Sequence, residues 1–137
     1  MSFVVDASIT LAWCFEEERT HRIMDLLHRL GQNGAQAPLL WPLEALNGLL
    51  MAQRRRRIDE RQRAELAAFL RDLPVTLDTE TTDHAWTTTA QLAERHRLSA
   101  YDASYLELAM RRKLPLATLD KDLIKAAKAV GTTVLGT

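Results

Sequence analysis

Residues 3–8 read Phe-Val-Val-Asp-Ala-Ser, and this short stretch decides the class of fold. Its first three residues are apolar β-formers, which predicts a strand buried on both faces. The run ends at Asp6, where such a strand would emerge from its sheet. Ser8 can then cap a helix that runs to about Trp13, because its hydroxyl can accept from free backbone amides. The stretch predicts a central strand of an α/β protein with an acid at its end.

Outward from this strand, helical and extended segments alternate. Apolar spacing and capping residues predict helices near residues 20–30, 43–57, 59–71, 83–97, 99–112 and 123–130. Short apolar runs predict further strands near 39–41, 75–77, 114–119 and 133–135. We expect Gly31 to end the helix near residues 20–30. We also expect the helix near residues 43–57 to bury Leu43, Leu46 and Leu50. This alternation indicates an α/β fold with helices flanking a mainly parallel sheet.

The bulk composition fits one soluble domain over residues 1–137. The apolar fraction is 47% and the charged fraction 26%, as in ordinary globular proteins. The chain has no apolar run long enough for a signal peptide or a membrane span, so we expect a cytoplasmic protein without a membrane partner. Its net charge is zero, with 18 basic and 18 acidic residues. Any binding of nucleic acid must therefore come from a local site.

Four acids stand where strands end or helices begin. Asp6 and Asp120 follow predicted strands, while Glu44 and Asp102 lie in the first turns of predicted helices. In open α/β sheets these positions meet at the crevice beyond the carboxyl ends of the strands. Two carboxylates about 4 Å apart repel by roughly 4 kcal/mol at an effective dielectric near 20. A cluster of four therefore predicts a bound cation.

The ligand set indicates which cation and which chemistry. Carboxylate oxygens without histidine or cysteine favour hard ions, of which Mg²⁺ and Mn²⁺ bind substrate phosphates as well. Such a site favours metal-assisted hydrolysis of a phosphodiester or phosphate. The sequence contains no Gly-x-Ser-x-Gly motif, no phosphate-binding glycine loop and no His-Glu-x-x-His motif.

Several of these residues also fit purely structural roles. Asp102 stands at capping-box spacing from Ser99, Asp120 can cap a helix, and Asp122 suits a first helical turn. The arginine run 54–57 could grip a phosphate backbone, but such runs are more often solvated helix ends. Tryptophans at helical spacing are usually part of a core, and this interpretation applies to Trp13, Trp41 and Trp86.

The words around the acids resemble a known family. Residues 4–8 (Val-Val-Asp-Ala-Ser), 42–47 (Pro-Leu-Glu-Ala-Leu-Asn), 98–109 (Leu-Ser-Ala-Tyr-Asp-Ala-Ser-Tyr-Leu-Glu-Leu-Ala) and 114–123 (Leu-Pro-Leu-Ala-Thr-Leu-Asp-Lys-Asp-Leu) are similar to the ordered motifs of PIN-domain proteins, specifically the VapC-type toxins of bacterial toxin–antitoxin pairs. The resemblance spans essentially the whole chain.

This resemblance implies a five-stranded PIN-like fold and a specific activity. Asp6, Glu44, Asp102 and Asp120 match the family's Mg²⁺ or Mn²⁺ ligands; Ser8, Asn47 and Thr118 match its supporting polar positions, and Asp122 a fifth acid. The implied protein is a homodimeric endoribonuclease that cleaves structured RNA and is inhibited by a cognate VapB-type antitoxin. The alternatives are a non-catalytic PIN-like module that binds RNA or protein, and a metal-dependent phosphatase.

Overall fold

The computed structural model describes residues 2–137 and contains a five-stranded parallel sheet of order β3-β2-β1-β4-β5. Its strands are β1 (Val4–Val5), β2 (Ala35–Pro38), β3 (Val75–Asp78), β4 (Leu116–Ala117) and β5 (Val134–Leu135). The earliest strand thus lies at the centre, as its apolar sequence predicts. The α/β architecture and the five-stranded sheet are confirmed.

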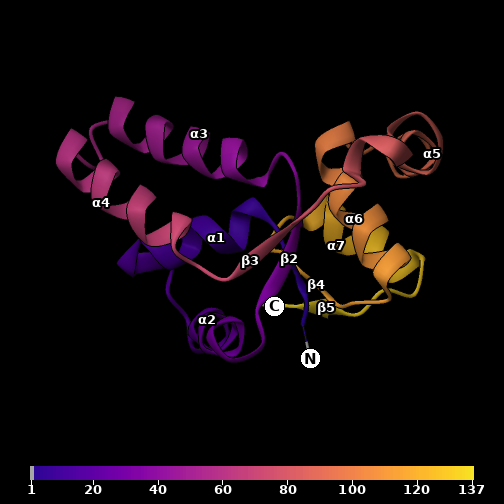
Figure 1. The fold of residues 1–137 in the computed structure, drawn as a ribbon, viewed down its shortest axis with the longest axis horizontal. Helices are drawn as coiled ribbons and strands as arrows, with labels where there is room; N and C mark the ends of the chain where they lie inside the picture. The colour runs from indigo at the N-terminus through magenta and orange to yellow at the C-terminus, as the bar shows by residue number, and fades with distance from the viewer. Residues whose placement is uncertain (1) are drawn as a thin grey trace.

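Helices cover both sides of this sheet (Figure 1). On one side lie α1 (Ala7–Cys14), α2 (His21–Asn33), α3 (Trp41–Arg54) and α4 (Glu60–Arg71); on the other lie α5 (Ala90–His96), α6 (Ala100–Arg112) and α7 (Lys121–Ala129). Helix α6 contacts β1, β2 and β4 in the middle of the sheet. Its position ties the centre of the fold to the helical layer that includes Asp102.

The register of β1 and β4 brings two distant segments side by side. Val5 is paired with Ala117, so the residues that follow them, Asp6 and Thr118, emerge together at the carboxyl edge of the sheet. The amide of Asp6 also donates to the carbonyl oxygen of Ala117 at 3.2 Å. The sheet register therefore positions the first polar pair of the candidate site.

Three details of the first half differ from expectation. Asp6, and not Ser8, caps α1, because its carboxylate accepts from the amide of Ile9. Helix α2 continues through Gly31 and ends before Gly34, whose φ of 72° lies in the left-handed region that favours glycine. Strand β2 lies at residues 35–38, before the predicted 39–41. These are local differences that leave the topology unchanged.

The buried face of α3 also differs from the leucine pattern. Because the helix begins at Trp41, its buried positions are Trp41, Ala45, Leu49 and Ala52, and Leu43 is 71% exposed. Between β3 and α5 the chain forms a 3-10 turn η2 (Thr81–His84) and a π-helical turn η3 (Ala85–Thr89), where one continuous α-helix was expected. Trp13 and Trp41 are core residues, but Trp86 is 92% exposed, so that prediction was wrong.

Within residues 2–137 no helix has the length and apolar character needed to cross a membrane.

Candidate active site

Asp6 is a buried carboxylate held by three donors. Its Oδ1 accepts from the Ser8 hydroxyl at 2.6 Å and from the Ile9 amide at 3.1 Å, and its Oδ2 accepts from the Thr118 hydroxyl at 2.5 Å. Burial raises its pKa from 3.8 to about 6 even though these hydrogen bonds lower it, and the charge of Asp102 adds to the rise. Asp6 therefore has a fixed orientation and an unfavourable charge.

Hydrogen bonds at the ends of β1 and β4 link Asp6 to Asp120. The Thr118 hydroxyl, which donates to Asp6, accepts from the Asp120 amide at 3.0 Å. The Ser8 hydroxyl likewise donates to Asp6 and accepts from the Leu119 amide at 2.9 Å. Asp120 caps α7 by accepting from the Leu123 amide, as its cap interpretation predicts. Ser8 and Thr118 thus support the acids through hydrogen bonds that the structure contains.

Glu44 lies in the first turn of α3. Pro42 occupies the same turn, where its missing amide proton costs no helical hydrogen bond. Its Oε1 accepts from the hydroxyl of Tyr105 on α6 at 2.7 Å. Burial raises the pKa of Glu44; the Tyr105 hydrogen bond opposes this and the charge of Asp102 reinforces it. Tyr105 is not among the residues predicted from the sequence, although its position one helical turn after Asp102 on the same helix is a signal that could have revealed it.

Asp102 interacts electrostatically with each of the other acids. Its charge raises the pKa of both Asp6 and Glu44. Its own pKa is raised by burial first and then by the charges of Asp120 and Asp122, while hydrogen bonding with Ser99 lowers it. Thr118 links Asp6 to Asp120, and Tyr105, one turn after Asp102 on α6, links Glu44 to that helix, so these contacts bring the four acids to one edge of the sheet.

The surroundings of the four acids fit a hard divalent cation. Among residues 2–137 none of them forms an ion pair with lysine, arginine or histidine, so no cationic side chain offsets their repulsion. In the same residues no three His, Cys, Asp or Glu side chains are arranged to ligate one ion together. Mg²⁺ commonly takes only one or two carboxylates directly and keeps several waters. The oxygen-only donor set therefore suits Mg²⁺ or Mn²⁺ bound partly through water.

The remaining predicted positions differ in their contacts. Asn47 is exposed on α3 and forms no hydrogen bond to the acids among the described residues. Asp122 is exposed in the first turn of α7, and its charge raises the pKa of Asp102. Asp122 thus lies at the margin of the acidic group.

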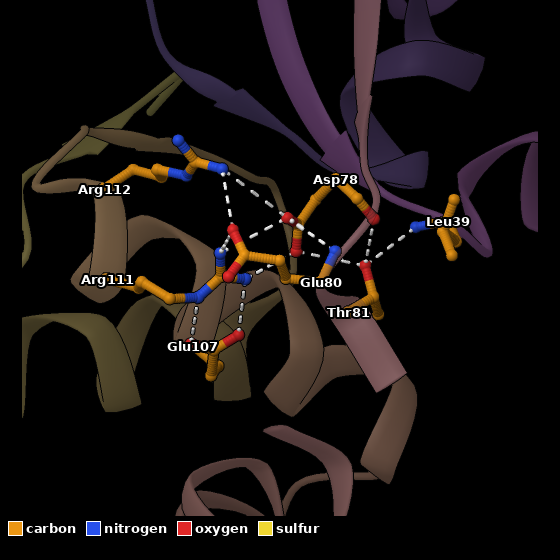
Figure 2. A network of polar contacts seen from close by, with 7 residues as sticks. All are labelled: Leu39, Asp78, Glu80, Thr81, Glu107, Arg111 and Arg112. Atoms are coloured by element: carbon orange, nitrogen blue, oxygen red, sulfur yellow. Dashed lines mark hydrogen bonds and ion pairs between the residues drawn. The ribbon is translucent and has the colours of Figure 1, made fainter. Parts of the chain in front are cut away.

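A second polar network, which sequence reasoning missed, closes the end of β3 onto α6 (Figure 2). Arg111 binds Asp78 through both terminal nitrogens, at 3.2 and 2.5 Å, and binds Glu107 at 2.8 Å. The Asp78 and Glu107 side chains are only 1% and 4% exposed. Burial alone would raise the pKa of Asp78, but hydrogen bonds from Arg111 and from the Glu80 amide leave it below its ordinary value.

This network is charge-compensated, unlike the acids around Asp102. Arg112 and Glu80 add an ion pair at 3.3 Å on its exposed side. Thr81 connects it to β2, since its hydroxyl accepts from the Leu39 amide and donates to the Asp78 carbonyl (Figure 2). The network therefore anchors α6 and η2 to the sheet, and each of its carboxylates contacts an arginine.

The arginine run at the end of α3 is partly committed to the fold. Arg57 pairs with Glu17 and Glu18, and its guanidinium lies 3.8 Å from the centroid of the Phe15 ring. The structural interpretation of the run therefore holds for Arg57, whereas the three arginines before it are exposed.

Residues 3–129 match the family model of the PIN domain. The chain belongs to the PIN domain family. The match covers all four acids and the whole sheet except β5. None of the curated proteins compared with this PIN domain matches it in sequence.

Solved structures share the fold of this PIN domain. PAE2754 from Pyrobaculum aerophilum superposes with a TM-score of 0.70 at 22% identity, covering 98% of this chain and 83% of the other. VapBC2 from Rickettsia felis, bound to a DNA fragment from their promoter, gives 0.67 at 16%, covering 98% and 97%. Mycobacterium tuberculosis VapC20, described as a Sarcin-Ricin loop cleaving toxin, gives 0.60 at 18%, covering 97% of each chain.

Proposed function

We propose that this PIN domain is an endoribonuclease that depends on Mg²⁺ or Mn²⁺ and acts as the toxin of a VapC-type toxin–antitoxin pair. The observation that carries the proposal is the uncompensated group of acids around Asp102 at the carboxyl edge of the sheet. The family supports nuclease activity, and the fold shared with VapC20, a toxin that cleaves the Sarcin-Ricin loop, supports RNA as the substrate.

In this proposal Asp6, Glu44, Asp102 and Asp120 hold the metal. A bound Mg²⁺ or Mn²⁺ ion supplies an acidified water and neutralises charge that develops on the phosphate. Ser8 and Thr118 keep the Asp6 carboxylate in one orientation, and Tyr105 does the same for Glu44. Asn47 and Asp122 are proposed to contact the metal's waters or the RNA. No nucleophilic side chain is required.

The proposal includes two protein partners. The VapBC2 structure contains both proteins of its pair, which supports a VapB-type antitoxin as the partner of this chain. Homodimer formation is proposed as well. Exposed apolar side chains, including Leu43 and Trp86, provide surface that protein contacts would remove from water.

Cleavage of cellular RNA by the purified chain tests the activity. We expect cleavage with Mg²⁺ or Mn²⁺, none with EDTA, and products with 5′-phosphate and 3′-hydroxyl ends. Asp6→Asn and Asp102→Asn should abolish it in folded protein. Asp25→Asn, which alters an exposed acid of α2, is the matched control and should cleave normally. Mapping of new RNA 5′ ends in cells, with and without the neighbouring gene product, extends the test to the target and the antitoxin.

Other outcomes would select another function. Folded wild-type protein that binds RNA but cleaves none with either metal would indicate a non-catalytic module. Metal-dependent hydrolysis of p-nitrophenyl phosphate without RNA cleavage would indicate a phosphatase. Products that end in cyclic phosphate would contradict hydrolysis by a metal-activated water.

A further inference from the structure

A surface pocket of about 540 Å³ lies between the end of α5 and the face of α7. Its lining includes the cationic side chains of Arg95, Arg97 and Lys125, the ring of His96, and Asp122. The pocket thus combines three permanent positive charges with one negative charge. It is distinct in chemistry from the acids around Asp102.

Neither the helix dipoles nor ion pairs explain why these three cations lie close together. Cations at the end of α5 complement its dipole, which explains Arg95 but not Lys125 in the middle of α7. Arg95, Arg97 and Lys125 are all exposed. Within residues 2–137 none of the three forms an ion pair, in contrast to Arg57 and Arg111. Their charges are therefore available to a ligand.

The pocket borders the acidic group through Asp122. Asp122 lines the pocket, and it lies in the first turn of α7, two residues after Asp120, which caps the same helix. A ligand that spans both places must offer a group for a metal held by acids and, next to it, an anionic group for the cations. A nucleic acid strand has this repeating character, because each nucleotide contributes one phosphate.

We propose that this pocket, formed by Arg95, Arg97 and Lys125, binds a backbone phosphate of single-stranded RNA that flanks the bond to be cleaved. The inference rests on the proposed function, in which the neighbouring acids are the site of RNA cleavage. Phosphate contacts fix the position of a strand without reading its sequence. The pocket would accordingly set the register of the RNA on the acids and contribute equally to all sequences.

The continuity with the acids favours RNA over an acidic protein segment. A protein that used only the three cations would have no need for the pocket to adjoin a metal site. The His96 Nε2 atom has no hydrogen-bond partner in the described residues, but it is buried. Because a ligand in the pocket would not reach a buried atom, we assign the ligand contacts to the exposed cations alone.

Salt-dependent RNA binding tests the pocket directly. The triple variant Arg95→Gln, Arg97→Asn, Lys125→Gln is compared with wild type; asparagine tolerates the left-handed conformation of residue 97, where φ is 54°. The control variant Arg22→Gln, Arg71→Gln, Lys113→Asn removes the same charge from exposed residues elsewhere, and residue 113 shares the left-handed conformation, with φ of 55°. Fluorescence anisotropy with a labelled single-stranded RNA of mixed sequence is recorded in EDTA, which prevents cleavage, over a series of salt concentrations.

We expect the pocket variant to bind RNA at least about tenfold more weakly, with a salt slope reduced by roughly 0.7, the contribution of one phosphate contact on a single strand. With Mn²⁺ its KM should rise while kcat stays close to that of wild type. The control variant should show a much smaller change. Thermal unfolding of all three proteins must match.

Three results would overturn the inference. The control variant could weaken binding as much as the pocket variant, which would indicate diffuse attraction. The pocket variant could bind RNA like wild type. Polyglutamate could bind wild type as tightly as RNA and lose affinity equally in the pocket variant, which would assign the pocket to an acidic peptide. RNA binding that depends on the pocket, without any cleavage, would instead refute only the proposed ribonuclease.

Discussion

The hydroxyl of Tyr105 donates to Oε1 of Glu44 at 2.7 Å and joins two helices from opposite sides of the sheet. Tyr105 is 1% exposed. Burial and the Glu44 charge raise its pKa, so the hydroxyl keeps its proton and remains a donor. The bond therefore fixes a carboxylate of α3 relative to Asp102, which lies one turn earlier on α6.

Tyr105→Phe should weaken Mn²⁺ binding by about 10–100-fold, the usual cost of removing a group that orients a metal ligand. The loss arises because Glu44 becomes both freer and harder to deprotonate. Isothermal titration near neutral pH measures the affinity. Tyr101→Phe, at a tyrosine that is 63% exposed on the same helix, is the control and should bind Mn²⁺ like wild type. Equal Mn²⁺ affinities for wild type and both variants would show that Tyr105 does not support the metal site.

Asp6 predicts an unusual dependence of stability on pH in metal-free protein. Its folded-state pKa of about 6 lies above its ordinary value of 3.8, so the native state holds this proton more tightly than the unfolded state. The contribution of Asp6 to stability is therefore lost as pH rises from about 4 through 6. The difference between these two pKa values corresponds to roughly 3 kcal/mol of unfolding free energy.

Asp6→Asn should abolish this dependence and, in EDTA at pH 7.5, equal or exceed wild type in stability by up to about 3 kcal/mol. Mn²⁺ should raise the unfolding temperature of wild type and leave that of the variant unchanged. Urea unfolding across pH 4 to 8 provides the measurement. A variant that is less stable than wild type at pH 7.5 would contradict the unfavourable charge of Asp6.

Thr118→Val tests the hydroxyl between Asp6 and Asp120. The substitution nearly preserves shape but removes the donor to Asp6 and the acceptor for the Asp120 amide. Because both partners are at least partly buried, we expect a loss of about 1–3 kcal/mol in unfolding free energy and weaker Mn²⁺ binding. Thr118→Ser retains the hydroxyl and should restore most of the metal affinity. Failure of serine to rescue would indicate that packing, and not hydrogen bonding, accounts for the effect.

Arg111→Met should destabilise the protein by about 3–5 kcal/mol, because it leaves the buried Glu107 without a cation and leaves the buried Asp78 with only Arg112, at 3.9 Å, among the described residues. Chemical denaturation at neutral pH measures the change. Arg61→Met is the matched control: Arg61 is 87% exposed in its pair with Glu65, and its loss should cost about 0.5 kcal/mol or less. A small effect at Arg111 would contradict the anchoring role of the network.

The sequence predicts the alternation of strands and helices because that information is local. The apolar run before Asp6 and the capping residues Asp59 and Ser99 each specify an element through nearby residues, and both of these caps are present. The face that α3 buries was not predictable in this way. It depends on where the helix begins, and Trp41 moves that start ahead of Leu43.

For the candidate site, the sequence identifies acids by their places at strand ends and helix starts. It does not reveal their partners, because these come from other parts of the chain. Tyr105 reaches Glu44 across 61 positions, and Arg111 reaches Asp78 across 33. The same limit applies to the pocket of Arg95, Arg97 and Lys125, since only the packing of α5 near α7 brings its cations together.

The hydrogen bond between Thr118 and Asp6 closes a loop of 112 positions. The entropy of closing a long loop opposes contacts of such separation, so we expect this one to form later than local contacts such as helical turns. Partly folded chains therefore carry all four acids yet lack the geometry to use them. In the proposed ribonuclease, late assembly of strand β4 would delay RNA cleavage until the polypeptide has largely folded.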